Sequence, residues 1–145
     1  MKKIVGIKPM NRQQIKEYVR QRINYGIRSA APFMRDMLKR TVGVQAPRRR
    51  APNTVCGWVA TTKAKESAPP RRVSGCGQAG IYYNFTKNGV SFRSRRRYMQ
   101  ILEYRSWRPH PWIKPTLQRF AGEFMRIVGQ AMNERRQGFD YAKPD

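Results

Sequence analysis

The chain has 145 residues and a formal net charge of +23, because 31 lysines and arginines outnumber eight acidic residues. Its length predicts one domain, residues 1–145, with room for one hydrophobic core but not for two. A mean hydropathy of -0.78 and the lack of any long apolar stretch in the sequence exclude a membrane span. The apolar run Ile4–Ile7 is too short for a signal-peptide core, so we expect a protein that is not exported.

The positive charge predicts strong attraction to polyanions, either nucleic acid or an acidic protein surface, and does not choose between them. Arginine dominates the basic runs, and its planar guanidinium group suits two-point contact with phosphate or carboxylate. For any single run, a solvated basic surface explains the charge equally well. The runs are Arg48–Arg50, Arg71–Arg72, Arg93–Arg97 and Arg135–Arg136.

Few residues of the sequence suit catalysis or metal binding. His110 is the single histidine, lies between two prolines and is expected to be structural. Cys56 and Cys76 stand in separate segments without the ligand spacing of a zinc site, and we expect them to remain free thiols. No nucleophile, base and orienting group occur at a readable spacing, so we expect no enzymatic activity and no cofactor.

Aliphatic residues at steps of four predict a long amphipathic helix in the N-terminal third of the chain. Asn11 suits the N-cap position, Gly43 follows the predicted end, and Pro32 is expected to kink or divide the helix. Such a helix reaches about 45 Å, more than a small domain needs, so part of it is expected to pack on a neighbour. The apolar positions are Ile15, Val19, Ile23, Ile27, Ala31, Met34 and Leu38.

Two exposed connections and a short strand follow the helix. Residues 43–52 carry two Ala-Pro pairs around three arginines and are expected to form an extended arm. Residues 55–62 alternate in the manner of a strand, with Trp58 on the side that faces the core. Residues 63–80 are expected to form a second arm that does not pack internally and that carries a contact.

A β-hairpin is the clearest local signal in the sequence. Residues 81–86 and 90–93 flank Lys87-Asn88-Gly89, and an Asn-Gly pair favours the positive φ angles of a type I′ turn. Residues 98–104 fit either a third strand or a short helical turn, because their apolar residues suit both periods.

The stretch Ile101–Leu117 joins an apolar run, a lone carboxylate, three prolines and the start of a helix. The prolines remove backbone donors and hold the preceding residues extended, which predicts a rigid corner. Because acidic residues are scarce, Glu103 is expected to pair with an arginine of the same or an adjacent subunit. Trp107 and Trp112 are either core residues or anchors of a subunit interface, and the core is the commoner place for tryptophan.

A second amphipathic helix is predicted from Pro115, at its first position, to about Arg136. Gly138 is expected to end it, and a short tail, residues 138–145, follows. We expect this helix to cover one face of the sheet. The predicted fold class is therefore α+β: an antiparallel β-sheet packed by a long N-terminal helix and a C-terminal helix, with extended arms.

The order of these elements and the segment Pro111-Trp112-Ile113-Lys114-Pro115 resemble the tail-completion proteins of HK97-type phages. In that family an apolar run ends in Glu followed by Gly-Thr, and a Pro-aromatic-aliphatic-basic-Pro segment then opens the C-terminal helix. Leu102-Glu103 and Pro111–Pro115 match this pattern, within a similarity that extends over residues 11–132. Tyr104-Arg105-Ser106 stands where the family has Gly-Thr.

The resemblance implies a non-enzymatic virion protein, assembled in the host cytoplasm, that forms a sixfold ring at the head–tail junction. Such a tail-completion, tail-terminator or neck protein contacts copies of itself, neck and tail-tube proteins and, without base specificity, the DNA that passes through the ring; no membrane is involved. The candidate contacts with subunits or partners are Arg48, Arg49, Arg50, Arg71, Arg72, Glu103, Trp107 and Trp112. The candidates for the DNA-facing lumen are Arg93, Arg95, Arg96 and Arg97.

The alternative is a non-enzymatic basic RNA- or DNA-binding protein, which the size and charge also suit, although no recognised nucleic-acid motif is present in the sequence. Tyr82, Tyr83 and Phe85 lie near Arg93–Arg97 and offer rings for stacking single-stranded nucleic acid, but strand alternation splits the three rings over two faces. A metal-dependent nuclease ranks third, because the sequence shows no paired carboxylates for magnesium.

Overall fold

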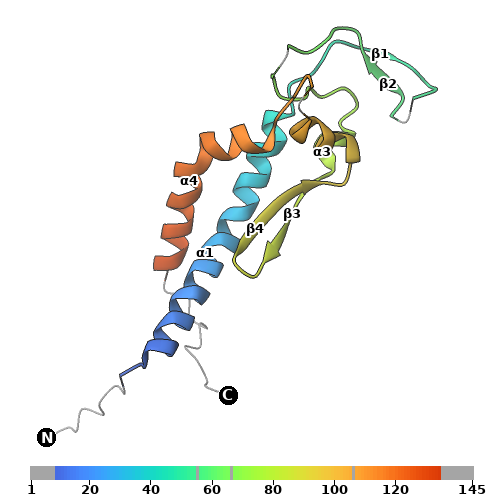
Figure 1. The fold of residues 1–145 in the computed structure, drawn as a ribbon. Helices are drawn as coiled ribbons and strands as arrows, with labels where there is room; N and C mark the ends of the chain where they lie inside the picture. Colours follow the sequence, from blue (N-terminus) through green and yellow to red (C-terminus); the bar gives the residue numbers. More distant parts are fainter. Residues whose placement is uncertain (1–8, 55, 66, 106, 135–145) are drawn as a thin grey trace, which may run out of the picture.

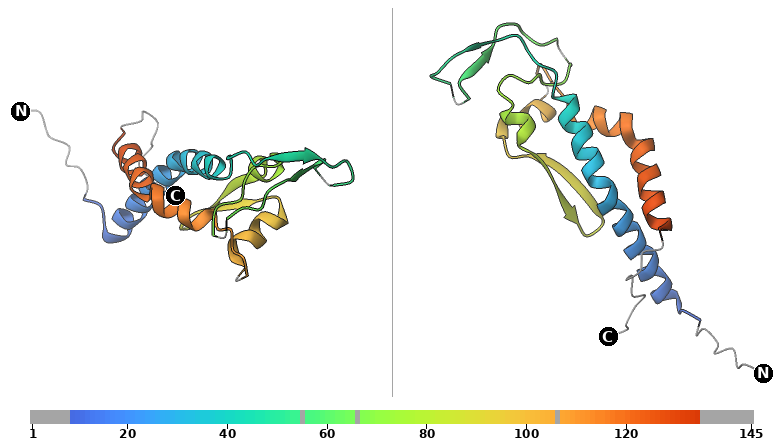
Figure 2. Two further views of the ribbon diagram at one scale, coloured as in Figure 1. Left: turned by 90° about the horizontal axis from the view of Figure 1, so that it is seen from above. Right: turned by 180° about the vertical axis from the view of Figure 1, so that it is seen from behind.

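Three layers make up the fold in the computed structural model, which describes residues 9–54, 56–65, 67–105 and 107–134. The elements are α1 (Arg12–Thr41), β1 (Arg48–Arg50), β2 (Trp58–Ala60), α2 (Cys76–Ala79), β3 (Ile81–Thr86), β4 (Gly89–Ser94), α3 (Arg97–Tyr104) and α4 (Ile113–Asn133). The long helix α1 lies in the middle, with α4 on one side and the β3–β4 hairpin on the other (Figure 1). Figure 2 shows the same order from above and from behind, and the β1–β2 hairpin projects from the end where α4 begins.

Helix α1 begins where the sequence predicts. The side chain of Asn11 accepts a hydrogen bond from the Gln14 amide at 2.9 Å, and Oε1 of Gln14 accepts one from the Asn11 amide at 2.9 Å. This reciprocal cap satisfies two amide groups near the start of the helix, where amides lack helical acceptors. The helix continues through Pro32 to Thr41, so its predicted end before Gly43 is confirmed and a division at Pro32 is not found.

The predicted α+β class is confirmed, although the described strands form two separate two-stranded sheets rather than one. Strand β3 pairs antiparallel with β4, from Ile81 opposite Ser94 to Thr86 opposite Gly89, as the hairpin prediction requires. Because this register places Gly89 in the strand, the turn residues are Lys87 and Asn88. Neither has a positive φ angle, so the predicted type I′ turn is wrong. The choice left open for residues 98–104 is resolved in favour of helix, because α3 covers them.

The two predicted arms pair with each other. Beside the β1–β2 sheet, the amide of Arg72 donates to the Val44 carbonyl at 2.8 Å, and the amide of Ala46 donates to the Arg72 carbonyl at 2.9 Å. Residues 63–80 also pack on α1, since Nε2 of Gln78 donates to the Lys39 carbonyl at 2.9 Å. The prediction that this arm does not pack internally is therefore wrong, because its backbone supplies the hydrogen-bond partners that the first arm needs.

Helix α4 begins at Ile113, two residues before the predicted start, and packs chiefly on α1. Because α1 lies between α4 and the hairpin, α4 does not cover a sheet face as the sequence predicts (Figure 2). The predicted stop at Gly138 and the tail, residues 138–145, lie outside the described residues. None of the helices that the structure describes combines the length and the apolar composition that a bilayer crossing requires.

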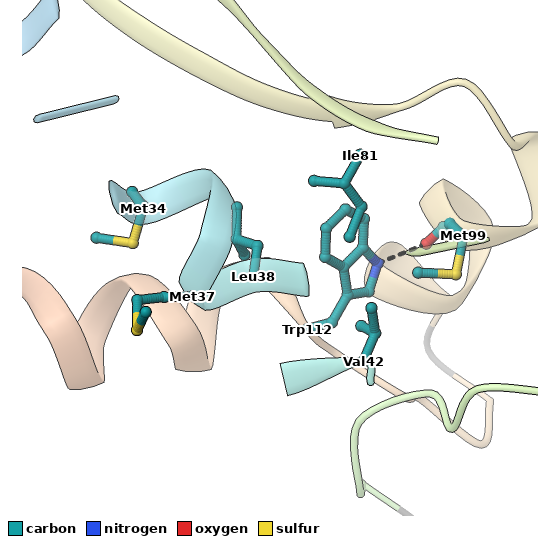
Figure 3. Close-up of a cluster of buried hydrophobic side chains, with 7 residues drawn as sticks. All are labelled: Met34, Met37, Leu38, Val42, Ile81, Met99 and Trp112. Atoms are coloured by element: carbon teal, nitrogen blue, oxygen red, sulfur yellow. Dashed lines mark hydrogen bonds between the residues drawn. The ribbon is translucent and has the colours of Figure 1, made fainter. Parts of the chain in front are cut away.

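Trp112 lies at the centre of the core. Its side chain is 0% exposed, and its indole Nε1 donates to the Met99 carbonyl at 2.8 Å (Figure 3). The surrounding apolar side chains come from α1, β3 and α3, so one tryptophan joins elements from most of the chain. The buried cluster consists of Met34, Met37, Leu38, Val42, Ile81, Met99 and Trp112.

Gly26 stands where α1 and α4 approach closely, and we expect Gly26→Ala to destabilise the protein. A Cβ there would lie 2.8 Å from both Cγ1 and the carbonyl oxygen of Val128, and backbone cannot yield as a side-chain end can. The helices must separate, which is expected to lower the free energy of unfolding by about 1–3 kcal/mol. Urea denaturation followed by circular dichroism measures this loss.

Gly129→Ala is the matched control for Gly26→Ala. A Cβ at Gly129 meets nothing within 4 Å, so alanine is expected to raise the free energy of unfolding by up to about 1 kcal/mol through its helix propensity. Equal stability of Gly26→Ala and the parent protein would contradict the close approach of the helices.

Candidate functional site

The carboxylate of Glu103 caps the N-terminus of helix α4. Its Oε2 accepts hydrogen bonds from the amides of Trp112 and Ile113, and its Oε1 accepts one from the amide of Lys114 at 2.9 Å. The first turn of a helix leaves such amides without helical acceptors, and the helix dipole favours negative charge there. The first turn of α4 contains no acidic residue of its own, so the carboxylate comes from α3.

The arginine partner that the sequence predicts for Glu103 is not found within the described chain. The ion pairs among the described residues join Arg20 to Glu17, Arg35 to Asp36 and Arg126 to Glu123. Glu103 instead uses both oxygens to accept hydrogen bonds from backbone amides, because the corner brings three amides to its carboxylate. The structure thus gives Glu103 a structural contact inside the chain, and pairing with an arginine of an adjacent subunit stays a prediction.

Trp112 and Thr116 secure the same corner from the inside. The buried Thr116 hydroxyl donates to the Trp112 carbonyl at 2.6 Å and lies 2.8 Å from the Thr41 hydroxyl. This contact ties the first turn of α4 to the last turn of α1. Because Trp112 has no exposed surface, its assignment to a subunit contact is wrong and the core explanation holds. The Thr41–Thr116 pair had no signal in the sequence, since threonine is usually a surface residue.

His110 connects this corner to the second arm. Its amide donates to the Leu102 carbonyl at 3.0 Å, and its Nδ1 lies 2.8 Å from the Ala68 carbonyl oxygen. The neighbouring Pro109 carbonyl accepts a hydrogen bond from the Ser67 amide at 3.0 Å. These contacts give His110 the structural role that the sequence predicts, and they hold part of residues 63–80 against the loop between α3 and α4.

Trp107, unlike Trp112, lies outside the core and is 68% exposed. The guanidinium carbons of Arg108 and Arg105 lie 4.9 Å and 5.9 Å from the centroid of its ring system. Ile101 and Tyr104 are also exposed on the adjoining helix α3. We call these five residues the α3 face. Contiguous exposed apolar surface indicates a contact site, so Trp107 remains a candidate for an interface.

The three arginines of β1 are exposed, and two of them cover one aromatic ring system. The guanidinium carbons of Arg48 and Arg50 lie 4.2 Å and 5.5 Å from the centroid of the Trp58 ring system, across the sheet. Trp58 is half-buried and lies outside the buried cluster, where it lines a pocket together with the core residues Val42 and Met99. Arg49 lies on the opposite face of this strand, since successive side chains alternate.

Arginines also hold the two arms together. Nη1 of Arg48 in the first arm donates to the Val73 carbonyl of the second arm at 2.6 Å. Nη2 of Arg71 ties the second arm to the Thr62 carbonyl beside β2 at 2.6 Å. Arg72 joins the arms through its backbone and exposes its side chain. The arm arginines thus have structural contacts, while the exposed surfaces of Arg49 and Arg72 are available to a partner.

Four exposed arginines surround the junction of β4 and α3, and we call them the β4–α3 arginine cluster. One of its members stacks on an aromatic ring, with the guanidinium carbon of Arg95 5.9 Å from the Tyr82 centroid. None of the ion pairs in the described part of the chain involves the cluster. Exposed cations without acidic partners attract polyanions. The members are Arg93, Arg95, Arg96 and Arg97.

The aromatic rings of β3 fall on two faces, as strand alternation predicts. Tyr83 and Phe85, with centroids 5.3 Å apart, face α1, whose Arg35 and Arg28 lie over them at 5.7 Å and 5.0 Å. Tyr82 lies on the other face beside Arg95. The three rings therefore do not form one platform for stacking single-stranded nucleic acid.

The two cysteines lie together, a contact that the sequence does not reveal. No disulfide bond joins them in this structure, and their Sγ atoms are 2.6 Å apart. The hydrogen bond from Cys56 lowers the pKa of the Cys76 thiol, and the hydroxyl of Ser74 lowers it further. Among the described residues, no group of three or more His, Cys, Asp or Glu side chains could hold a metal ion.

The chain was compared with protein-family models, with curated proteins and with solved structures, and none of the three comparisons found a match. Its function is therefore inferred from the residues and contacts described above.

Glu103→Ala is expected to destabilise the protein, because three amides at the start of α4 lose their acceptor. Hydrogen bonds to a charged group each contribute about 1.5–3 kcal/mol, and solvent reaches part of this site, so we expect the free energy of unfolding to fall by roughly 2–3 kcal/mol. Glu103→Gln retains one acceptor oxygen and is expected to lose less. Urea denaturation of the purified variants measures the change.

The matched control for Glu103→Ala is Glu123→Ala. Glu123 lies on the solvent-exposed side of α4 and forms an ion pair with Arg126, which is one helical turn away. Removing an exposed ion pair is expected to change stability little. If Glu103→Ala unfolds at the same urea concentration as Glu123→Ala, the capping role of Glu103 is wrong.

Proposed function

We propose that this chain is a structural, non-enzymatic subunit of a tailed-phage virion, which forms a sixfold ring at the head–tail junction as a tail-completion, tail-terminator or neck protein. The contact between Glu103 and the start of α4 carries the proposal. It joins the two segments on which the resemblance to HK97-type tail-completion proteins rests, Leu102-Glu103 and Pro111–Pro115. A resemblance that rests on two separate segments is better supported when the two segments contact each other in the fold.

The geometry also supplies a physical reason for the pattern. A carboxylate at the end of one helix caps the next helix only if the loop returns the chain to it. Pro109 and Pro111 fix their own φ angles in this loop, and Arg108 before Pro109 turns the chain with a positive φ of 45°. Pro115 lies in the first turn of α4, where its missing amide donor costs no helical hydrogen bond. Tyr104 and Arg105, which depart from the family pattern, donate none of the capping hydrogen bonds.

The exposed basic surfaces take separate roles in the proposed ring. The β4–α3 arginine cluster faces the lumen, where its guanidinium groups screen the phosphates of passing DNA without reading bases. The arm arginines Arg48–Arg50, Arg71 and Arg72 contact acidic surfaces of adjacent subunits or of neck and tail-tube proteins. The α3 face, with Trp107 at its centre, adds an apolar anchor to one of these contacts.

Disruption of the gene in its source phage or prophage, followed by electron microscopy of the particles, tests the proposal. DNA-filled heads beside unattached tails, or tails of abnormal length, are the expected result. A plasmid copy of the gene should restore infectious particles, and a copy with Gly129→Ala should do so equally well. Normal, infectious virions from the disrupted phage would overturn the assignment to the head–tail junction.

A second candidate is a non-enzymatic RNA- or DNA-binding protein, which the exposed β4–α3 arginine cluster favours. A dedicated binder prefers a sequence or a structure, whereas the proposed ring subunit binds duplex DNA with steep salt dependence and no preference. Competition between unrelated duplexes and structured RNAs separates the two classes. A measurable preference for one of them would favour the second candidate over the first.

Both candidates make the β4–α3 arginine cluster the main contact with nucleic acid, and replacement of its four arginines by glutamine tests this. Each phosphate contact contributes about 0.9 to the slope of log K against log salt, so the slope is expected to fall by up to about 3–4. Fluorescence anisotropy with labelled duplex DNA measures the slope. The control variant changes four exposed cations elsewhere, Arg12, Lys63, Lys114 and Arg119, to glutamine. An equal loss in both variants would contradict a specific role for the cluster.

A further inference from the structure

The N-terminal part of α1 carries an aliphatic stripe that nothing in the described chain covers. Ile15, Val19 and Ile23 are 49%, 44% and 40% exposed. They stand four residues apart, so their side chains lie on one face of the helix. Three exposed aliphatic residues on one helix face are unusual for the surface of a strongly charged chain. Apolar surface of this kind indicates a contact site.

This stripe continues an interface that already exists. Further along the same face of α1, Gly26 meets Val128 of α4, and the Phe33 ring packs edge-on against the Phe120 ring at 6.2 Å. Helix α1 has 30 residues and α4 has 21, which corresponds to about 45 Å and about 32 Å. The stripe therefore runs past the end of α4, near the hydrogen bond that Arg22 donates to the Met132 carbonyl. A helix occupies one part of this face, and none of residues 9–134 that the structure describes covers the other part.

The borders of the open part are basic. A shallow groove of about 440 Å³ lies between α1 and the tip of the β3–β4 hairpin, and Ile15, Val19 and Ile23 themselves line it. Lys16 and Arg20 line it from α1, Arg20 also forming the ion pair with Glu17 at 3.9 Å, and Lys87 lines it from the hairpin tip. The surface thus combines an aliphatic strip with a positively charged edge.

We propose that this surface binds an acidic amphipathic helix of a partner protein, which lies on α1 in line with α4. The shape follows from the interface that it continues, because this face of α1 already accepts a helix. The partner's aliphatic side chains cover Ile15, Val19 and Ile23, and its carboxylates lie against Lys16, Arg20 and Lys87. This inference stands on the stripe and its basic border and does not depend on the proposed function.

Charge decides between this partner and two other occupants. A second copy of the chain would bring a further net charge of +23 to a basic border. Residues 135–145, which lie outside the described residues, contain three basic and two acidic side chains and so offer no excess of acidic side chains to this border. Like charges across an interface oppose association, whereas an acidic helix is attracted.

Binding of two designed helical peptides to the full-length chain tests the proposal. Both peptides carry the same leucine stripe over about 15 residues, long enough to cover the roughly 12 Å between Ile15 and Ile23. One has glutamates and the other lysines at the flanking positions. Fluorescence anisotropy is expected to show binding of the glutamate peptide that weakens as salt rises, and at least tenfold weaker binding of the lysine peptide. Equal binding of the two peptides would overturn the proposal.

Val19→Asp locates the contact, with Val44→Asp as its matched control. Val44 is 63% exposed and lies far along the chain from the stripe, so its substitution is expected to leave binding unchanged. Val19→Asp is expected to weaken binding of the glutamate peptide at least tenfold. Circular dichroism checks that the variant is folded, and Val19→Ser serves in its place if it is not. Unchanged binding by a folded Val19 variant would overturn the proposal.

The two other occupants give distinct results. Sedimentation velocity that shows self-association of the parent chain, abolished by Val19→Asp, would identify a second copy as the occupant and overturn the proposal. Tighter binding of the peptide after deletion of residues 135–145 would identify that segment as the occupant and overturn it as well. Peptide binding that neither self-association nor this deletion alters is the expected outcome.

Discussion

The rest of the structure depends on one carboxylate, that of Glu103. It supplies acceptors for three amides at a partly buried helix start, where unpaired amides would be costly. It also sets the direction of α4, because Trp112 is held at its amide by Glu103 and at its indole by the Met99 carbonyl. Helix α4 then covers one side of α1 while the β3–β4 hairpin covers the other. In a chain with eight acidic residues, this one is used to position a helix rather than to neutralise a guanidinium group.

The scarcity of acidic residues also explains how the arginines are held. The ion pairs among the described residues join only sequence neighbours or residues one helical turn apart. Arginines from several elements lie instead over aromatic rings, as Arg28 does over Phe85, Arg48 over Trp58 and Arg108 over Trp107. Such a contact contributes about 0.5–1 kcal/mol at an exposed site and leaves the charge in place. The protein therefore orders its arginines without cancelling their charge, which stays available to polyanionic partners.

Most predictions that succeeded rest on residues close together in the chain, although the local type I′ turn was wrong, and the predictions about long-range contacts failed. The cap at Asn11 and the hairpin of residues 81–94 follow from local chemistry, so the sequence shows them directly. The pairing of the two arms does not follow from local chemistry. A composition rich in proline, glycine and arginine predicts a loop, even where the amides of that loop donate to another loop. The place of Trp58 outside the buried cluster and the Cys56–Cys76 contact were not predicted, for the same reason. The sequence indicated that Glu103 is important. Its hydrogen-bond partners could not be predicted, because they are backbone amides, which every residue type except proline has.

The interface between α1 and α4 joins distant parts of the chain, since Arg22 and Met132 are 110 residues apart. Contacts of this separation form late, because a long loop must close before they are made. During synthesis, α1 leaves the ribosome well before α4 exists, and its whole apolar face then lacks the helix that later covers most of it. The hairpin can form and pack during this interval, but the core cannot close without Trp112. The speed of translation therefore decides whether α1 first meets its own C-terminal helix or a different polypeptide.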